Sequence, residues 1–259
     1  MGFVSRKKLV FKAALFALIW AVLSYVFHFH VSRNVNFLQR SDQILKIADL
    51  AYYLEIVRAF WFRGLGQIYR LDVQQQILSA ATGAPVAASM PLNVFPTALI
   101  LWLPFAAALQ HSMALAFSFW NGFSLTVMIA AFLRLFENLA RNGRSKMLLL
   151  PVFFAFLSDA AAACLIIGQT SIFLGAVLML LFMQCSEKRD RGKSTQSVME
   201  VLLLLALSIK PQYFALGLAI ALICRRFTVL IMALGGAGII TLLVSPPLGL
   251  DWPAHYLNT

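Results

Sequence analysis

A carboxylate close to several aromatic side chains is the first group in this sequence that could act as a catalytic base. Asp49 is followed by Tyr52 and Tyr53, and Trp61 comes a few helical turns later. A carboxylate partly removed from water beside such rings has a raised pKa, which suits it to accept a proton from a hydroxyl group. The alternative is structural, because Asp is also a favoured residue at a helix N-cap. Asp49 is therefore a candidate general base.

Lys210 is a cation inside a long apolar run, and Pro211 follows it. A charged group in the middle of a membrane helix costs about 2.5–3.5 kcal/mol on insertion scales, so such a group is often functional. Pro211 lacks an N–H and therefore interrupts the backbone hydrogen bonding of a helix. Lys210 is a candidate for binding a phosphate group. In the alternative, it pairs with Asp159 or lies near the membrane interface.

Two further polar groups have weaker claims to a site. The segment Gly168-Gln-Thr-Ser171 offers the amide of Gln169 and two hydroxyls to a hydroxylated ligand, although it is equally a turn between helices. His28 and His30 could bind a metal, but neighbouring positions of this spacing diverge on a helix, which favours interface histidines. No metal site is predicted, because no Cys/His cluster of metal-binding spacing occurs.

The composition is that of an integral membrane protein. Hydrophobic residues make up 61% of the 259 residues and charged residues 12%, and the mean hydropathy is +0.83. A soluble domain is about half apolar and about a quarter charged. The basic residues lie in short groups between apolar runs, a pattern typical of cytoplasmic loops, and this argues against nucleic acid binding in spite of the net charge of +11.

The elements that must position these groups are apolar helices. A membrane-spanning helix needs about 20 apolar residues, and a short amphipathic helix from Leu50 to Trp61, ended by Gly64 and Gly66, can lie on the membrane surface. Residues 74–76 and 80–89 are predicted to be a loop with little regular structure. The apolar runs are Leu9–Phe29, Phe95–Leu109, Met113–Phe136, Met147–Ile167, Thr170–Cys185, Val198–Cys224 and Phe227–Leu248.

The basic loops 141–146 and 188–193 limit the topology. If every apolar run crossed the bilayer, both loops would lie outside, against the positive-inside rule. A re-entrant Phe95–Leu109, with Val198–Cys224 broken at Lys210-Pro211, removes the conflict. We expect a single all-α domain, a polytopic transmembrane bundle of six to eight membrane segments. It comprises an uncleaved anchor (1–29), a long extracytoplasmic loop (30–92), a helical bundle (93–248) and an aromatic interfacial tail (249–259).

Seven short motifs follow one another along the chain. They are Asp49-Leu-Ala-Tyr-Tyr, Gly64…Tyr69, Phe95-Pro-Thr-Ala-Leu-Ile-Leu-Trp-Leu-Pro104, Ile167-Gly-Gln-Thr-Ser171, Ile209-Lys-Pro-Gln-Tyr213, Arg225-Arg226 and Asp251-Trp-Pro-Ala-His-Tyr256. Their order resembles that of glycosyltransferase family 87, a bacterial membrane family of the GT-C superfamily. Thr97 departs from the family pattern, which has a second proline there, and similar proteins usually continue with further spans, so the chain is expected to be a shortened member or a fragment.

The resemblance implies a GT-C-like fold and a hexosyltransferase. The enzyme would move a sugar, often mannose, from a polyprenyl-phosphate donor to a lipid or glycan acceptor at the outer face of the bacterial inner membrane. Asp49 would be the catalytic base. Substrate-binding residues would be Tyr52, Tyr53, Gln169, Lys210 and Gln212, and no cofactor is implied. The alternatives are a transporter of a lipid or small polar solute, which broken helices also suit, and an inactive scaffold subunit.

Overall fold

The computed structural model describes residues 3–33, 49–82, 92, 94–141, 170–186, 194–249 and 251–257, and within these ranges its regular elements are all helices, without a strand. The expected all-α class is therefore confirmed. The longer helices are α1 (Phe3–Arg33), α8 (Met113–Arg141), α11 (Ser171–Ser186), α12 (Ser194–Leu207), α13 (Pro211–Ile223) and α14 (Phe227–Leu248). The shorter ones are α4 (Asp49–Phe62), α5 (Leu71–Thr82), α6 (Thr97–Leu101), α7 (Leu103–Leu109) and α15 (Trp252–Leu257).

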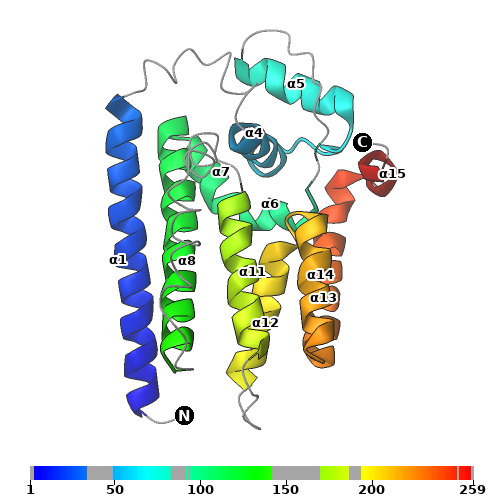
Figure 1. Ribbon diagram of the computed structural model, residues 1–259. Coiled ribbons are helices and arrows are strands. Elements are labelled where there is room, and N and C mark those ends of the chain that lie inside the picture. Colours follow the sequence, from blue (N-terminus) through cyan, green and yellow to red (C-terminus); the bar gives the residue numbers. More distant parts are fainter. Residues whose placement is uncertain are drawn as a thin grey trace.

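The longer helices stand side by side, and the shorter ones gather at one end of them (Figure 1). We call this the capped end, because α4, α5, α6 and α15 cover it. We call the opposite end the basic end, because Arg225 and Arg226 lie there between α13 and α14. At this end α1 and α12 begin, and α8 and α11 finish (Figure 1). The buried ion pair of Arg226 with Glu200 (3.5 Å), and the hydrogen bond from Arg226 to the carbonyl of Cys185 (3.1 Å), join three helices there.

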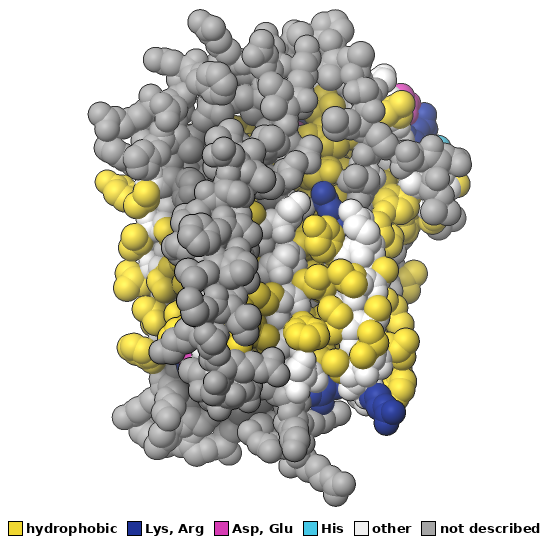
Figure 2. Space-filling model, viewed as in Figure 1, with side chains coloured by type: hydrophobic (Ala, Val, Ile, Leu, Met, Phe, Trp, Pro, Cys, Tyr) yellow, Lys and Arg dark blue, Asp and Glu magenta, His cyan; other side chains and the backbone are white. Residues whose placement is uncertain are grey.

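Two of the described helices, α8 and α14, are long and apolar enough to cross a membrane. Large apolar side chains of α14 face outward: Ile231, Leu242 and Leu243 are 71–72% exposed. Figure 2 shows hydrophobic side chains over most of the visible face of the described helices, with Lys and Arg side chains at its lower margin and also in its upper part. A water-soluble surface would not gather so much apolar area. These features support membrane association.

The apolar run Phe95–Leu109 forms two short helices, α6 and α7, which meet at Trp102. Each is far shorter than the roughly 20 residues that a crossing needs. Pro96 and Pro104 each stand at the start of one of these helices, where a missing N–H costs nothing. The segment is therefore compatible with the predicted re-entrant element.

The run Val198–Cys224 is broken at Lys210-Pro211, as expected, and its two halves form a hairpin. α12 and α13 lie antiparallel, and their 14 and 13 residues make each about 20 Å long. Pro211 cannot continue α12, so the chain reverses at residues 208–210. Lys210 therefore lies at the tip of a hairpin at the capped end, which corrects the expectation that it sits in the middle of a span. Residues 142–169, with Asp159 and the predicted span Met147–Ile167, lie outside the described residues.

Two expectations about the segment after α1 need correction. Residues 71–82 form the helix α5, not a loop, because Gln74, Ile77 and Leu78 make one buried face at helical spacing. α4 ends before Gly64 as predicted, but it does not lie on a surface. Leu50, Leu54 and Val57 are at most 1% exposed, because α5 and α7 pack against this helix.

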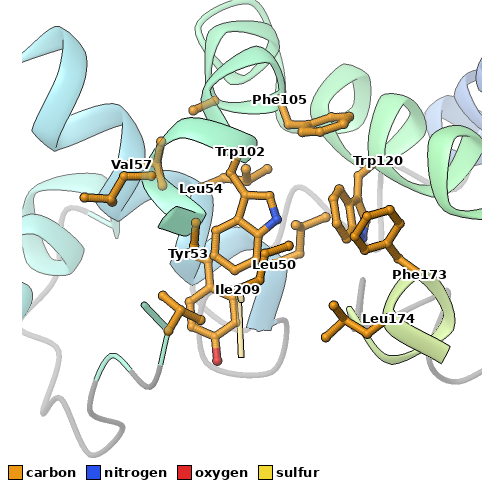
Figure 3. Close-up of a cluster of buried hydrophobic side chains, with 14 of the residues drawn as sticks. Leu50, Tyr53, Leu54, Val57, Trp102, Phe105, Trp120, Phe173, Leu174 and Ile209 are labelled. Carbon is orange, nitrogen blue, oxygen red and sulfur yellow. The ribbon is translucent and has the colours of Figure 1, made fainter. Parts of the chain in front are cut away.

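Aromatic rings form the centre of the core beneath α4 (Figure 3). Tyr53 of α4 stacks on Trp102 with ring centres 4.9 Å apart. The edge of Trp102 then meets Trp120 of α8 (6.2 Å, 84°), which also contacts Phe173 of α11 (5.4 Å). Large buried rings contribute more apolar area than any other side chains. They fix α4 and α7 against α8 and α11, and thereby set the floor of the capped end.

Candidate active site

Lys210 is the cation that the fold places at the tip of the α12–α13 hairpin. Its backbone is extended (φ −120°, ψ 125°), and its carbonyl accepts hydrogen bonds from the N–H groups of Tyr213 and Phe214. The side chain is half-buried and has no hydrogen bond or ion pair within the described part of the chain. Four arginines differ in this respect, since each forms an ion pair: Arg58, Arg70, Arg134 and Arg226. A half-buried ammonium without a counter-ion is suited to hold an anionic ligand.

The start of α11 lies at the same end as the start of α13, and the two helices pack together (Figure 1). Helix N-termini carry a partial positive charge and unpaired N–H groups, which favour anions. Thr170 precedes α11, is 1% exposed, and its hydroxyl has no hydrogen-bond partner. Gln212 is exposed in the first turn of α13. Gln169 lies outside the described residues, so its proposed contact with substrate stays a prediction.

Tyr52 and Tyr53 are buried at the capped end. The Tyr52 hydroxyl donates to Gln74 Oε1 (2.6 Å), and Gln74 Nε2 donates in turn to the carbonyl of Ile68 (2.8 Å). Burial raises the pKa of the Tyr52 phenol well above its ordinary value of 10.0, so this hydroxyl remains protonated. The contacts hold α4 against α5 and against Trp102. A substrate contact by either tyrosine stays a prediction.

The carboxylates at the capped end differ in their environments. Asp49 is the first residue of α4, and its side chain lies outside the described residues. Glu55 is buried and pairs with Arg58 (2.7 Å); its pKa is raised by burial, against the opposing effect of Arg58. The exposed Asp72 has a lowered pKa because Arg70 donates two hydrogen bonds to it (2.8 and 3.1 Å). Of these three, Glu55 and Asp72 are therefore engaged by arginines.

An aromatic cluster that the sequence did not reveal joins the tail to the segment before α6. Tyr69 donates a hydrogen bond to the carbonyl of Val94 (2.8 Å) and contacts Trp252 and Tyr256 of α15 (5.3 and 5.8 Å). Tyr256 also packs on Phe95 (5.5 Å), whose N–H bonds to the carbonyl of Ile209. The cluster therefore reaches the residue before Lys210. The i,i+4 spacing of Trp252 and Tyr256 was the available signal for a common helix face.

His28 lies in a different place. With Ser24 it lines an apolar groove of about 400 Å³ between α1 and α8, and Figure 1 shows these helices on the side opposite α13 and α14. The side chain of His30 is outside the described residues. Within the described ranges, no group of three or more His, Cys, Asp or Glu side chains is arranged to hold a metal ion.

Comparison with known proteins identifies the family. The model of glycosyltransferase family 87 matches residues 96–259, well over half of the chain. This chain belongs to glycosyltransferase family 87. No curated protein and no solved structure matches it.

The matched residues of this family 87 glycosyltransferase run from the start of α6 to the tail, and they include Lys210 and Gln212. The match leaves α4 out, so it gives no support to the role expected of Asp49. Membership makes the protein a glycosyltransferase, which moves a sugar from a donor to an acceptor. An unpaired cation at the N-cap of α13 suits a donor with an anionic leaving group.

Proposed function

We propose that this glycosyltransferase moves a hexosyl group, in particular mannosyl, from a polyprenyl-phosphate donor to a hydroxyl of a lipid or glycan acceptor. The observation that carries the proposal is the half-buried Lys210 at the hairpin tip, without a counter-ion in the described structure. A phosphate ester is the leaving group that such a cation stabilises as negative charge develops on it. A donor anchored by its lipid would reach the tip from the bilayer.

The arrangement of the two ends supports an active site on the outer side of a bacterial inner membrane. Basic residues gather at the basic end, where Arg225 and Arg226 join α13 to α14 and the starting turns of α1 carry Arg6, Lys7 and Lys8. The positive-inside rule would place this end in the cytoplasm. With short α6 and α7 and a hairpin at Lys210, the predicted multi-pass topology needs no basic loop outside.

The reaction we propose is a single displacement at the anomeric carbon. Asp49 accepts the proton of the acceptor hydroxyl as that oxygen bonds to the anomeric carbon. The bond from this carbon to the phosphate oxygen breaks, and the electron pair leaves with the phosphate. Lys210 holds the phosphate charge. Gln169 and Gln212 offer amide groups to the sugar or the phosphate, and Tyr52 and Tyr53 set the aromatic wall beside Asp49.

The test is a transfer assay in membranes with radiolabelled polyprenyl-phosphate-mannose and lipid and glycan acceptors. Wild type is compared with Asp49→Asn and Lys210→Ala at matched expression. Lys12→Ala is the matched control, because Lys12 is an exposed lysine of the apolar helix α1. We expect Asp49→Asn to abolish transfer. Lys210→Ala should lower kcat/KM for the donor about 10- to 100-fold, the range for a hydrogen bond to a charged group.

Each other outcome changes the proposal in a defined way. Transfer that survives Asp49→Asn would move the base to Asp42, Glu55 or Asp72. Equal activity of Lys210→Ala and Lys12→Ala would remove Lys210 from the phosphate site. A wild type that transfers no sugar from any polyprenyl-phosphate donor would contradict the proposed donor. Movement of lipid or solute without transfer would favour the transporter, and neither activity would favour the scaffold.

A further inference from the structure

The hairpin tip contains backbone carbonyls that its own helices do not satisfy. In a continuous helix the carbonyls of Ser208 and Ile209 would accept hydrogen bonds from residues 212 and 213. The chain reverses here, and the Tyr213 N–H donates to the carbonyl of Lys210 instead. Buried carbonyls need partners, so another segment must supply donors.

The start of α6 supplies both donors. Phe95 N–H donates to the carbonyl of Ile209 (3.1 Å), and the Thr97 hydroxyl donates to the carbonyl of Ser208 (3.1 Å). The Ser208 hydroxyl lies within hydrogen-bond distance of two acceptors, Thr97 Oγ1 (2.8 Å) and the carbonyl of Leu205 (2.6 Å). Thr97 is 6% exposed and Ser208 is fully buried, so water does not compete for these groups. The contacts join residues 111 positions apart in the chain.

These contacts fix the two residues that precede Lys210. We propose that Thr97 and Ser208 are positioning residues that set Lys210 for the donor phosphate; this rests on the phosphate role given to Lys210 above. Neither residue is a catalytic residue, because both are buried in the seam between α6 and the tip. A fixed lysine loses less conformational freedom on binding than one on a loose turn. Thr97, the departure from the family pattern, thus gains a function that a proline could not perform.

The kinetic test uses Thr97→Val, which keeps the shape and removes the hydroxyl, and Thr97→Ser, which restores it. We expect Thr97→Val to raise the donor KM about fivefold, the factor that one neutral hydrogen bond provides, with the acceptor KM unchanged. Thr97→Ser should remain close to wild type. Thr126→Val is the matched control, since the buried Thr126 hydroxyl bonds to the carbonyl of Gly122 (2.6 Å) within α8.

The decisive comparison repeats Thr97→Val in the Lys210→Ala background. If the pair acts through Lys210, the donor KM of the double variant equals that of Lys210→Ala alone. An equal further rise in both backgrounds, or the same loss from Thr126→Val, would overturn the positioning role. Lys210→Ala with an unchanged kcat/KM for the donor would instead refute the phosphate role itself, so the two failures are distinguishable.

A second measurement does not depend on catalysis. In a Lys210→Cys protein whose native cysteines are replaced by serine, the alkylation rate at position 210 reports how the tip is held. We expect Thr97→Val to change this rate severalfold and Thr126→Val to leave it unaltered. An alkylation rate insensitive to Thr97→Val would overturn the positioning role whatever the kinetics show.

Discussion

Two proline-containing helix ends meet at the capped end, and the chain uses them differently. The α12–α13 tip has Pro211 at the first position of α13, and α14 has Pro246 and Pro247 in its last turn. At both places a carbonyl accepts a backbone N–H from a distant segment: Phe95 donates to Ile209, and Gln67 donates to Pro247 (2.9 Å). At both helix ends, a backbone N–H from a distant segment therefore satisfies a carbonyl that the helix itself leaves without a partner.

The two helix ends differ in the residues that follow the hydrogen-bonded carbonyls of Ile209 and Pro247. At the tip the next residue is Lys210, whose ammonium has no counter-ion within the described ranges. After α14 comes Gly249 with a positive φ of 85°, and then α15, whose rings pack on Tyr69. One end leaves a cation available and the other is closed by aromatic packing. Changes at the α14 end should therefore lower stability, whereas changes at the tip should lower activity.

The largest loss of stability is expected from Gly66→Ala. A Cβ at Gly66 would overlap the carbonyl oxygen of Pro247, which is backbone and cannot rotate away. We expect a loss of about 3 kcal/mol from this overpacking, measured as the free energy of unfolding in detergent.

Gly64→Ala is the control for Gly66→Ala. Gly64 has a positive φ of 66°, but no atom lies within 4 Å of the position its Cβ would take. It should lose only about 1 kcal/mol, from backbone strain alone. Equal losses at both glycines would contradict a tight contact between residue 66 and the end of α14.

A smaller loss of stability is expected from Tyr69→Phe, because Tyr69 lies between the segment before α6 and the helix that follows α14. It removes the donor to the Val94 carbonyl in a site where Tyr69 is 2% exposed. The free energy of unfolding should fall by about 1–2 kcal/mol, while kcat/KM per folded molecule remains within a factor of two. Tyr25→Phe is the control, because Tyr25 is 71% exposed on α1. A large loss of donor affinity with intact stability would assign Tyr69 to the site instead.

Local patterns in the sequence were sufficient for several elements. The bounds Phe227–Leu248 of α14 agree with the predicted run, because an uninterrupted apolar segment between Arg226 and Gly249 has no competing structure. Gly64 ends α4 as expected, since its positive φ suits glycine. The ion pair of Arg134 with Glu137 (3.5 Å) likewise joins residues three positions apart. Each of these features depends on residues close together in the chain.

The candidate site was harder to predict, because long-range contacts build it. The order of the motifs was enough to name the family, and a charge inside an apolar run drew attention to Lys210. Neither pattern predicted the hairpin that carries Lys210. Thr97 was noted only as a departure from the pattern, and its bond to Ser208 depends on how α6 packs on the tip. Gln74 looked like a loop residue, yet it is buried and completes two hydrogen bonds. Propensity does not reveal partners that are distant in sequence.

The smallest effect on stability is expected from breaking the pair of Asp251 and His255, just beyond α14. A small effect would show that charge contributes little to the stability of this helix end. Asp251 has a lowered pKa chiefly because His255 donates a hydrogen bond to it (2.9 Å). Because folding lowers this pKa, the ionised Asp251 stabilises the fold at pH values above its ordinary pKa of 3.8. This stabilisation is lost as the pH falls through the folded pKa. The Tm of His255→Ala should thus lie slightly below that of wild type at pH 6, and the two should converge as the pH falls below 3.8. His111→Ala, which changes an exposed histidine before α8, should have the Tm of wild type at every pH.

A Tm difference that persists unchanged to pH 3 would mean that packing of the His255 ring, rather than its bond to Asp251, holds α15 in place. Either result leaves the α14 end dependent on its backbone cap and its aromatic rings, in contrast to the tip, where the single charge of Lys210 is expected to decide activity.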